Sequence, residues 1–359
     1  MNKQFKSMEE RAKLFHSFYR KENNRALLGF YIGSEYPVPR YPSMSKLQEG
    51  KPLTPEDFPV EGFLIDSENL HIAHEQCGGD FIWSGTPYWG IPWLEVFLGC
   101  PIYVNHSTGS IYSEPPTSFD SRNYEIRFNP DDPWVKLMDV MLKELAVKSN
   151  GRWPIATTRM RGLTDLLSAL YGGSEFVINM MMDSDGVHTV ADKLVKFWID
   201  AARYQVERIP DFHGGIGSFY YYAWAPQKTV WYQEDAAALL SPDYFSEFIE
   251  DRMRTIVNSL DGSIMHQHST GYVPTESYIN MNFHALELHI DEGGPRAEEL
   301  CDKYKLILSA KPLIIWGNIP ERDMDWIFSN LPHEGLAVIT MVESSDEAEQ
   351  IWNKYQSDK

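Results

Sequence analysis

Cysteine is scarce in this sequence. The 359 residues include three cysteines, Cys77, Cys100 and Cys301, and no two of them form a Cys-x-x-Cys pair. A disulfide framework or a thiolate-rich metal site needs more cysteines at closer spacing. The sequence therefore excludes both and favours a reducing compartment.

Long apolar runs are also missing. No stretch reaches about 18 apolar residues, the length that a membrane-spanning helix needs. Residues 1–20 are charged and have the pattern of a helix, so they lack the apolar segment of a secretory signal. We therefore expect a cytoplasmic protein that does not cross a membrane.

Basic residues are outnumbered, with 32 Lys and Arg against 51 Asp and Glu, and the formal net charge is -19. Nucleic acids and anionic membranes bind clustered Lys and Arg, and this surface would repel their phosphates. We expect neither partner. A small-molecule substrate or another protein is the better interpretation, and a homodimer stays open.

Apolar and aromatic residues are plentiful, at 43% and 13% of the chain, and aromatics cluster in residues 81–93 and 219–232. Two interpretations of these clusters stay open. Aromatic side chains bury large areas and could pack a core or a barrel rim. They could also line a flat, apolar ligand pocket.

The N-terminal part has an uneven pattern. Residues 1–25 predict an N-terminal helix, and the apolar run 26–33 predicts a first strand. Residues 34–60 carry six prolines, too many for a regular element, and we expect irregular loops or a cap over 34–60 and 80–130. Residues 62–66, 101–107 and the polar stretch 108–130 suggest further strands, a hairpin or cap elements.

Residues 150–359 alternate regularly between β-rich runs and amphipathic helices. The predicted strands are 154–160, 215–224, 263–269, 285–291, 306–317 and 335–342. The predicted helices are 162–172, 185–208, 235–259, 295–304, 321–330 and 346–357.

This alternation is typical of parallel strands joined by crossover helices. Six such units, with two from the N-terminal part, predict an α/β fold in which residues 1–359 form a single (β/α)8 barrel of the TIM type. No glycine-rich phosphate-binding turn occurs, which argues against a nucleotide-binding fold. A barrel places its chemistry at the C-terminal ends of its strands.

Three segments carry a resemblance to a known family. RGLTDLLSALYGGSEFVINMMMDSDGVHTVADKLVKF (161–197), QEDAAALLSPDYFSEFIEDRMRTIV (233–257) and DGSIMHQHSTG (261–271) are similar to motifs of the uroporphyrinogen-decarboxylase-like superfamily. The resemblance extends over roughly residues 80–359. It implies a TIM barrel with one of two activities: cofactor-free porphyrinogen decarboxylation, or zinc-dependent methyl transfer between a corrinoid protein and a thiol or methoxy substrate.

The chain departs from both patterns. The decarboxylases grip substrate carboxylates with an N-terminal Arg-x-Ala-Gly-Arg motif, where this chain has GFYIGSEYPVPRYP (29–42). The thiol-activating methyltransferases bind zinc through His-x-Cys and a later cysteine. Here His268 replaces the first cysteine, and the last strand ends in Glu343 without a cysteine, so we expect imidazole and carboxylate ligands instead.

Histidines and carboxylates occur at a spacing of two on neighbouring predicted strands. His266 and His268 share one strand face, and Glu287, His289 and Asp291 share a face of the next strand. Strand ends converge on the axis of a barrel, so imidazoles and carboxylates could meet there and hold Zn²⁺ or a similar divalent ion. The predicted metal ligands are His266, His268, His289 and Glu343.

Other interpretations of this cluster stay open. His266, His268, Glu287 and Asp235 could act as metal-free acids and bases, since a histidine beside a carboxylate titrates near neutral pH. The histidines could also serve structure alone. Asp235, which the resemblance places near the site, could equally cap a helix.

Four residues are candidates for substrate binding. Arg159 and Arg161, near the end of a predicted strand, could clamp an anionic group, although a salt bridge to a neighbouring acid explains them equally well. Glu35 and Tyr36 follow the first strand and could line the pocket.

The leading hypothesis is a metal-dependent, methyltransferase-like enzyme that transfers a methyl or other one-carbon group, with a corrinoid on a partner protein as co-substrate. The second is a cofactor-free decarboxylase or lyase acting on a carboxylated aromatic or a tetrapyrrole. The third is a non-catalytic barrel that binds a tetrapyrrole or corrinoid.

Overall fold

Seven parallel strands form one sheet in the computed structural model, which describes residues 5–219 and 222–356. Every neighbouring pair in the sheet is parallel. In spatial order the strands are β1 (Leu27–Ile32), β11 (Leu336–Val342), β10 (Leu313–Gly317), β9 (Ala285–Ile290), β8 (Gly262–His268), β7 (Thr229–Gln233) and β4 (Met160–Arg161).

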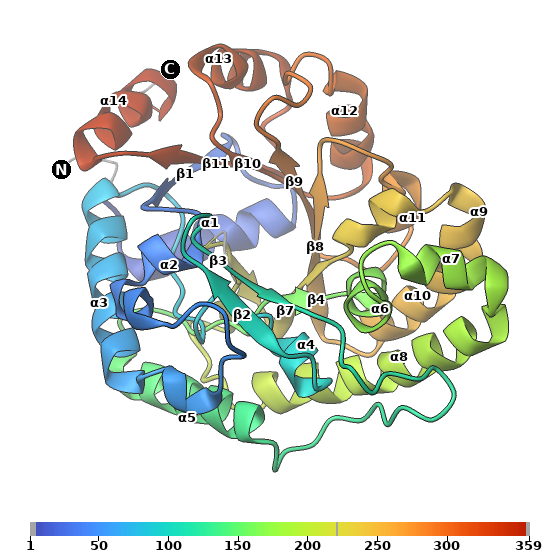
Figure 1. The fold of residues 1–359 in the computed structure, drawn as a ribbon. Coiled ribbons are helices and arrows are strands. Elements are labelled where there is room, and N and C mark those ends of the chain that lie inside the picture. Colours follow the sequence, from blue (N-terminus) through green and yellow to red (C-terminus); the bar gives the residue numbers. More distant parts are fainter. Residues whose placement is uncertain (1–4, 220–221, 357–359) are drawn as a thin grey trace.

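Helices surround these strands as an outer layer (Figure 1). They cover the outer face of the sheet, so strands such as β10 are buried along their whole length and are apolar throughout. The helices are α1 (Met8–Tyr19), α3 (Val60–Cys77), α5 (Pro133–Ser149), α6 (Leu163–Tyr171), α7 (Glu175–Met182), α8 (Ser184–Val206), α9 (Pro242–Phe245), α10 (Asp251–Asn258), α11 (Thr275–Ile279), α12 (Cys301–Ala310), α13 (Glu321–Asn330) and α14 (Ser345–Gln356).

The α/β fold with parallel strands agrees with the prediction, but a closed eight-stranded ladder is not found in the described residues. The edge strands β1 and β4 are not joined by a ladder within the described residues, where an isolated parallel bridge pairs Gly85 with Ile155. Pro154 has no N–H to donate, and the N–H of Thr158 donates instead to Oε1 of Gln205 at 2.8 Å. These two features interrupt the ladder at this point.

Several predicted elements differ from the structure. Residues 62–66 belong to helix α3 and not to a strand. The apolar period of this helix is hard to see in the sequence because polar residues, Asp66, Ser67, His71 and His74, lie on its buried face. The predicted strand 306–317 divides into the end of α12 and strand β10, and the predicted helix 295–304 begins only at Cys301.

The predicted strand 215–224 is a hairpin of short antiparallel strands, β5 (Gly215–Gly217) and β6 (Trp224–Pro226). The strand that enters the sheet is β7, which follows directly. The predicted strand 154–160 keeps its ladder only at β4. The predicted helix 235–259 is broken into a 3-10 turn (Asp235–Leu239), α9, a π-helical turn (Ser246–Glu250) and α10.

The two irregular regions contain short elements that cover the carboxyl ends of the strands. A hairpin of β2 (Ile102–Asn105) and β3 (Ser110–Ser113) crosses in front of the strands in Figure 1. The N–H of Val38, in the short helix α2 (Pro37–Arg40), donates to the carbonyl of Gly109 in this hairpin at 3.0 Å. Helix α4 (Trp93–Phe97) lies within the second of these regions.

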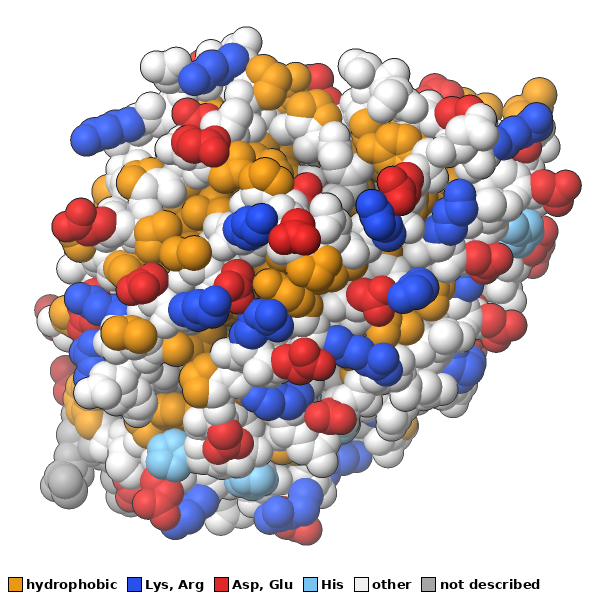
Figure 2. Space-filling model, turned by 90° about the horizontal axis from the view of Figure 1, so that it is seen from below, with side chains coloured by type: hydrophobic (Ala, Val, Ile, Leu, Met, Phe, Trp, Pro, Cys, Tyr) orange, Lys and Arg blue, Asp and Glu red, His pale blue; other side chains and the backbone are white. Residues whose placement is uncertain are grey.

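The surface mixes charges of both signs. On the face shown in Figure 2, acidic and basic side chains alternate among apolar ones, so the excess of acid does not form one continuous area there. Within residues 5–219 and 222–356, no helix combines the length and apolar character that a membrane crossing needs. All three cysteines are free thiols.

Candidate metal site and substrate cavity

Three histidines meet at the carboxyl ends of β8 and β9. His266 and His268 extend from one face of β8, and the register pairs His268 with His289 of β9. One ring nitrogen from each histidine lies within 4.8 Å of the others. The alternation of side chains along a strand therefore brings together the imidazoles that the sequence predicts.

Two of these rings each have a carboxylate of their own behind them. The register places Glu287 opposite His266, and its buried Oε2 accepts a hydrogen bond from His266 Nδ1. Asp291, just after β9, accepts from His268 Nδ1 at 2.5 Å. Because each Nδ1 is engaged in this way, Nε2 of both rings is left for a ligand, the arrangement that fixes metal-binding histidines.

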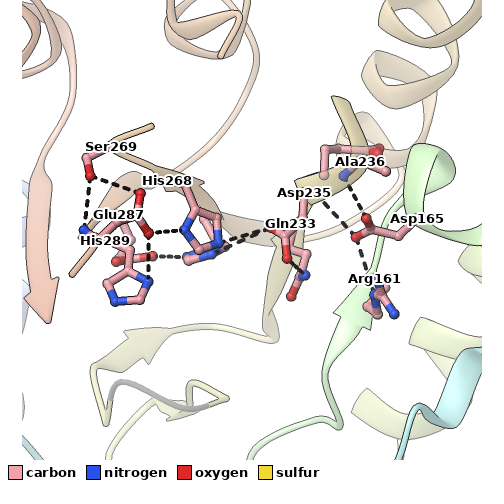
Figure 3. A network of polar contacts seen from close by, with 12 residues as sticks. Arg161, Asp165, Gln233, Asp235, Ala236, His268, Ser269, Glu287 and His289 are labelled. Atoms are coloured by element: carbon pink, nitrogen blue, oxygen red, sulfur yellow. Dashed lines mark hydrogen bonds and ion pairs between the residues drawn. The ribbon is translucent and has the colours of Figure 1, made fainter. Parts of the chain in front are cut away.

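Asp235 faces the same nitrogens. Its Oδ1 lies 3.7 Å from Nε2 of His266 and 3.6 Å from Nε2 of His268. Gln233 donates from its side-chain amide to the other oxygen of Asp235. Asp165 holds the backbone behind it, accepting from the N–H of Ala236 at 2.9 Å. Figure 3 shows this chain of contacts from His268 through Asp235 to Asp165.

Burial and neighbouring charge set the protonation of the cluster. Burial, with the charges of His268 and His289, holds the pKa of His266 well below its usual value. Burial also lowers the pKa of His289 to about 4. Burial opposes the charged form of His268 as well, but the hydrogen bond to Asp291 and the charge of Asp235 outweigh it and raise its pKa. At neutral pH, His266 and His289 are therefore neutral, the form that binds metal.

The pKa of Asp235 is raised to about 6, first by burial and then by the charge of Asp165. This pKa is close to neutral pH, which suits a carboxyl group that accepts and donates protons during a reaction. Three imidazoles and an adjacent carboxylate form a donor set that suits Zn²⁺ and similar divalent ions. The residues present therefore fit such an ion.

A cavity of about 310 Å³ opens beside the histidines. It is walled by strand ends on one side and by the cap residues on the other. Its lining is Glu35, Tyr36, Pro37, Trp89, Gly90, Ser110, Ile111, Arg159, Phe219, Trp231, Gln233, Asp235, His266, His268 and His289. The structure thus brings Glu35, Tyr36, Arg159 and Asp235 to the same cavity as the three histidines.

Arg161 does not join this lining. Its Nη1 lies 2.7 Å from Oε1 of Glu95, and its Nε lies 3.5 Å from Oδ2 of Asp165. Burial opposes the charged form of Arg161, but these two carboxylates raise its pKa. Of the two interpretations that the sequence leaves open for Arg161, the structure shows the salt bridge to neighbouring acids, and α4, from the irregular region, supplies Glu95.

Glu343 is also distant from the histidine group. It follows β11, and β10 separates β11 from β9, which carries His289. Its exposed side chain lines a different cavity, between the ends of β1 and β11. The expectation that Glu343 is a metal ligand is corrected by this strand order, and Asp235 is the carboxylate that faces the imidazoles.

Sequence reasoning missed Gln233, whereas the aromatic walls of the cavity come from the clusters 81–93 and 219–232, for which a ligand pocket was one of the two interpretations. Phe219 and Trp231 have ring centroids 5.1 Å apart, and Trp231 lies 5.1 Å from the ring of His266. The run Thr229–Gln233 is rich in β-branched and aromatic residues after the turn at Gln227, which has a positive φ of 62°. This pattern was the available signal for β7 and hence for Gln233 at its end.

Comparisons with known proteins give a fold and no family. No family model and no curated protein sequence matches the chain. Its structure is similar to a methyltransferase from Methanosarcina mazei, with a TM-score of 0.65 and 15% identity over 97% of this chain and 99% of the other. A B12-independent methionine synthase from Shewanella sp. W3-18-1 aligns at 11% identity over 91% of this chain and 94% of that one, but its TM-score of 0.47 carries no argument.

Proposed function

We propose that this chain is a metal-dependent methyltransferase of the uroporphyrinogen-decarboxylase-like superfamily. The observation that carries the proposal is the group of His266, His268 and His289, with carboxylates behind two of the rings. The shared fold with a methyltransferase from Methanosarcina mazei supports the reaction class. The segments 161–197, 233–257 and 261–271 support the superfamily.

The three imidazoles would hold the ion, and a bound divalent metal supplies Lewis-acid activation of a heteroatom that attacks or releases a methyl group. Glu287 and Asp291 orient the rings of His266 and His268. Asp235 lies within 4 Å of both Nε2 atoms and is placed to accept the proton of a substrate heteroatom at its Oδ1.

The cap completes the site. Tyr36 and Ser110 line the cavity from the cap side, while Trp231 lines it from β7. These walls limit the access of water to the reacting atoms and strengthen the electrostatic interactions between them.

The remaining parts of the proposal concern partners. A corrinoid protein would serve as the second substrate and exchange the methyl group at the mouth of the cavity, and a small molecule would occupy the cavity itself. We place the protein in the cytoplasm as a single-domain enzyme, in keeping with its free thiols. A homodimer is compatible with this arrangement.

Metal analysis of protein purified without a histidine tag tests the proposal. We expect about one divalent ion per chain, with loss of the ion in the double variant His266→Ala/His268→Ala, because two of the ligands are removed. His188→Ala is the matched control, since His188 stacks on Phe248 in the helical layer, away from the group. Protein that holds no ion after incubation with zinc, in wild type and variants alike, would refute the proposal.

A further inference from the structure

A cationic side chain in the cavity has no carboxylate partner among the described residues. Arg159 lies just before β4, is largely buried and lines the cavity. Within the described residues it makes no hydrogen bond or ion pair, and its Nε is buried without a partner. Its neighbour Arg161, two residues on, is paired with Glu95 and Asp165.

The nearby acids do not neutralise Arg159. Glu95 and Asp165 form ion pairs with Arg161. Asp235 accepts a hydrogen bond from Gln233 and faces the histidines. Their charges act on Arg159 from beyond ion-pair distance. Burial is the larger effect and lowers the pKa of Arg159, yet a guanidinium stays protonated in proteins. A buried cation without a partner is costly, and an anion from a ligand would remove that cost.

Aromatic rings form the wall between the cap and the histidines. Trp89 and Phe219 have ring centroids 6.5 Å apart, Phe219 and Trp231 5.1 Å, and Trp231 and His266 5.1 Å. Flat side chains in such a series contact a flat ligand over a large area. A cavity of about 310 Å³ is at the lower limit for ligand sites, so a single ring with its substituents fits better than a tetrapyrrole.

We propose that the substrate bound in this cavity is a small planar aromatic acid, whose carboxylate pairs with Arg159 and whose ring contacts Trp89, Phe219 and Trp231. The reacting heteroatom of the ring then faces the three histidines. Glu35 also lines the cavity and repels an anion beside it, which leaves Arg159 as the anchor. This inference rests on the proposed function for the reaction but not for the binding.

Binding to metal-free protein separates the two proposals. The probes are benzoate, its neutral analogue benzamide and the non-planar cyclohexanecarboxylate, each measured by isothermal titration calorimetry after chelation. We expect benzoate to bind more tightly than both. Arg159→Met weakens benzoate binding by about 10- to 100-fold, as expected for a charge-assisted hydrogen-bonded pair, and changes benzamide binding little. Arg159→Lys restores part of the loss.

Arg122→Met, the same substitution at an exposed arginine, is the matched control and leaves benzoate binding unchanged. Equal affinity for benzoate and benzamide, no effect of Arg159→Met, or no binding of benzoate by the wild-type protein would each overturn the inference. Failure of the histidines to hold a metal changes none of these measurements, so the outcome for Arg159 stands apart from that for the metal.

Discussion

Replacement of Glu287 by glutamine is expected to affect metal affinity and stability in opposite directions. Glu287 is fully buried and accepts the hydrogen bond of His266 Nδ1. Glutamine keeps the size of the side chain and can still accept that bond through its amide oxygen. The substitution removes only the negative charge behind the ring.

The magnitude follows from the kind of contact that is lost. A hydrogen bond to a charged acceptor contributes about 1.5–3 kcal/mol, about twice what a neutral one does. Loss of the charge therefore weakens metal binding by about 10- to 100-fold, the range found for carboxylates behind metal-binding histidines. In the metal-free protein the effect reverses, because a buried carboxylate beside a neutral imidazole has lost its hydration without a compensating positive charge, and removing that charge is expected to stabilise the fold by about 1–3 kcal/mol.

Two measurements check this prediction. Competition with a chromophoric chelator gives the metal affinity of wild type and Glu287→Gln, and urea unfolding of the metal-free proteins gives their stabilities. Asp291→Asn is the comparison: Asp291 is more exposed and also accepts from Ser269 and Thr270, so its loss costs local structure as well. Unchanged metal affinity in Glu287→Gln, or weaker affinity with no gain in metal-free stability, would refute the reasoning.

Three further predictions concern protons and packing. Metal affinity falls by about tenfold per pH unit below the raised pKa of His268, because one proton must leave its Nε2; chelator titrations between about pH 8 and about pH 6 measure this, and a flat profile contradicts it. Gly162→Ala destabilises the fold by at least about 1–3 kcal/mol in urea unfolding, because its Cβ would lie 2.3 Å from Oε1 of Glu234; an unchanged midpoint contradicts this. Burial and Asp165 raise the pKa of Glu234 to about 7 from 4.5, so the folded state binds the proton more tightly. Stability therefore falls by about 3 kcal/mol as pH rises through that window, and Glu234→Gln removes this slope.

The histidine group could be predicted because it depends on local rules. The spacing of two in His266-Gln267-His268, and between Glu287 and His289, places side chains on one strand face whatever the rest of the chain does. Apolar runs bounded by turns predicted β8, β9 and β11, and the amphipathic period predicted α13 and α14. Ser241 before α9 and Pro242 at its first position mark its start, and the side chain of Ser241 accepts the N–H of Tyr244 as expected of a cap.

The partners of these residues depend on tertiary structure and could not be predicted. The pairing of His266 with Glu287 is a matter of strand register, which the sequence of either strand leaves open. The ion pair of Arg161 needs Glu95, which comes from α4 in a region whose sequence has no clear pattern. Helix α3 was misread because polar residues, His71 and His74 among them, occupy its buried face.

The charge of the site follows from the residue at position 268. The superfamily pattern that the sequence resembles has a cysteine there, and a thiolate would bring a negative charge directly to a divalent ion. In the proposed metal site, His268 would be a neutral ligand once its Nε2 has lost its proton, so the compensating charge would come from residues that do not need to touch the ion. Glu287, Asp291 and Asp235 are the carboxylates placed to supply it. The acidic residues at this mouth and the imidazole at position 268 would then be two parts of one arrangement, with Arg159 at its edge as the proposed anchor of an anionic substrate.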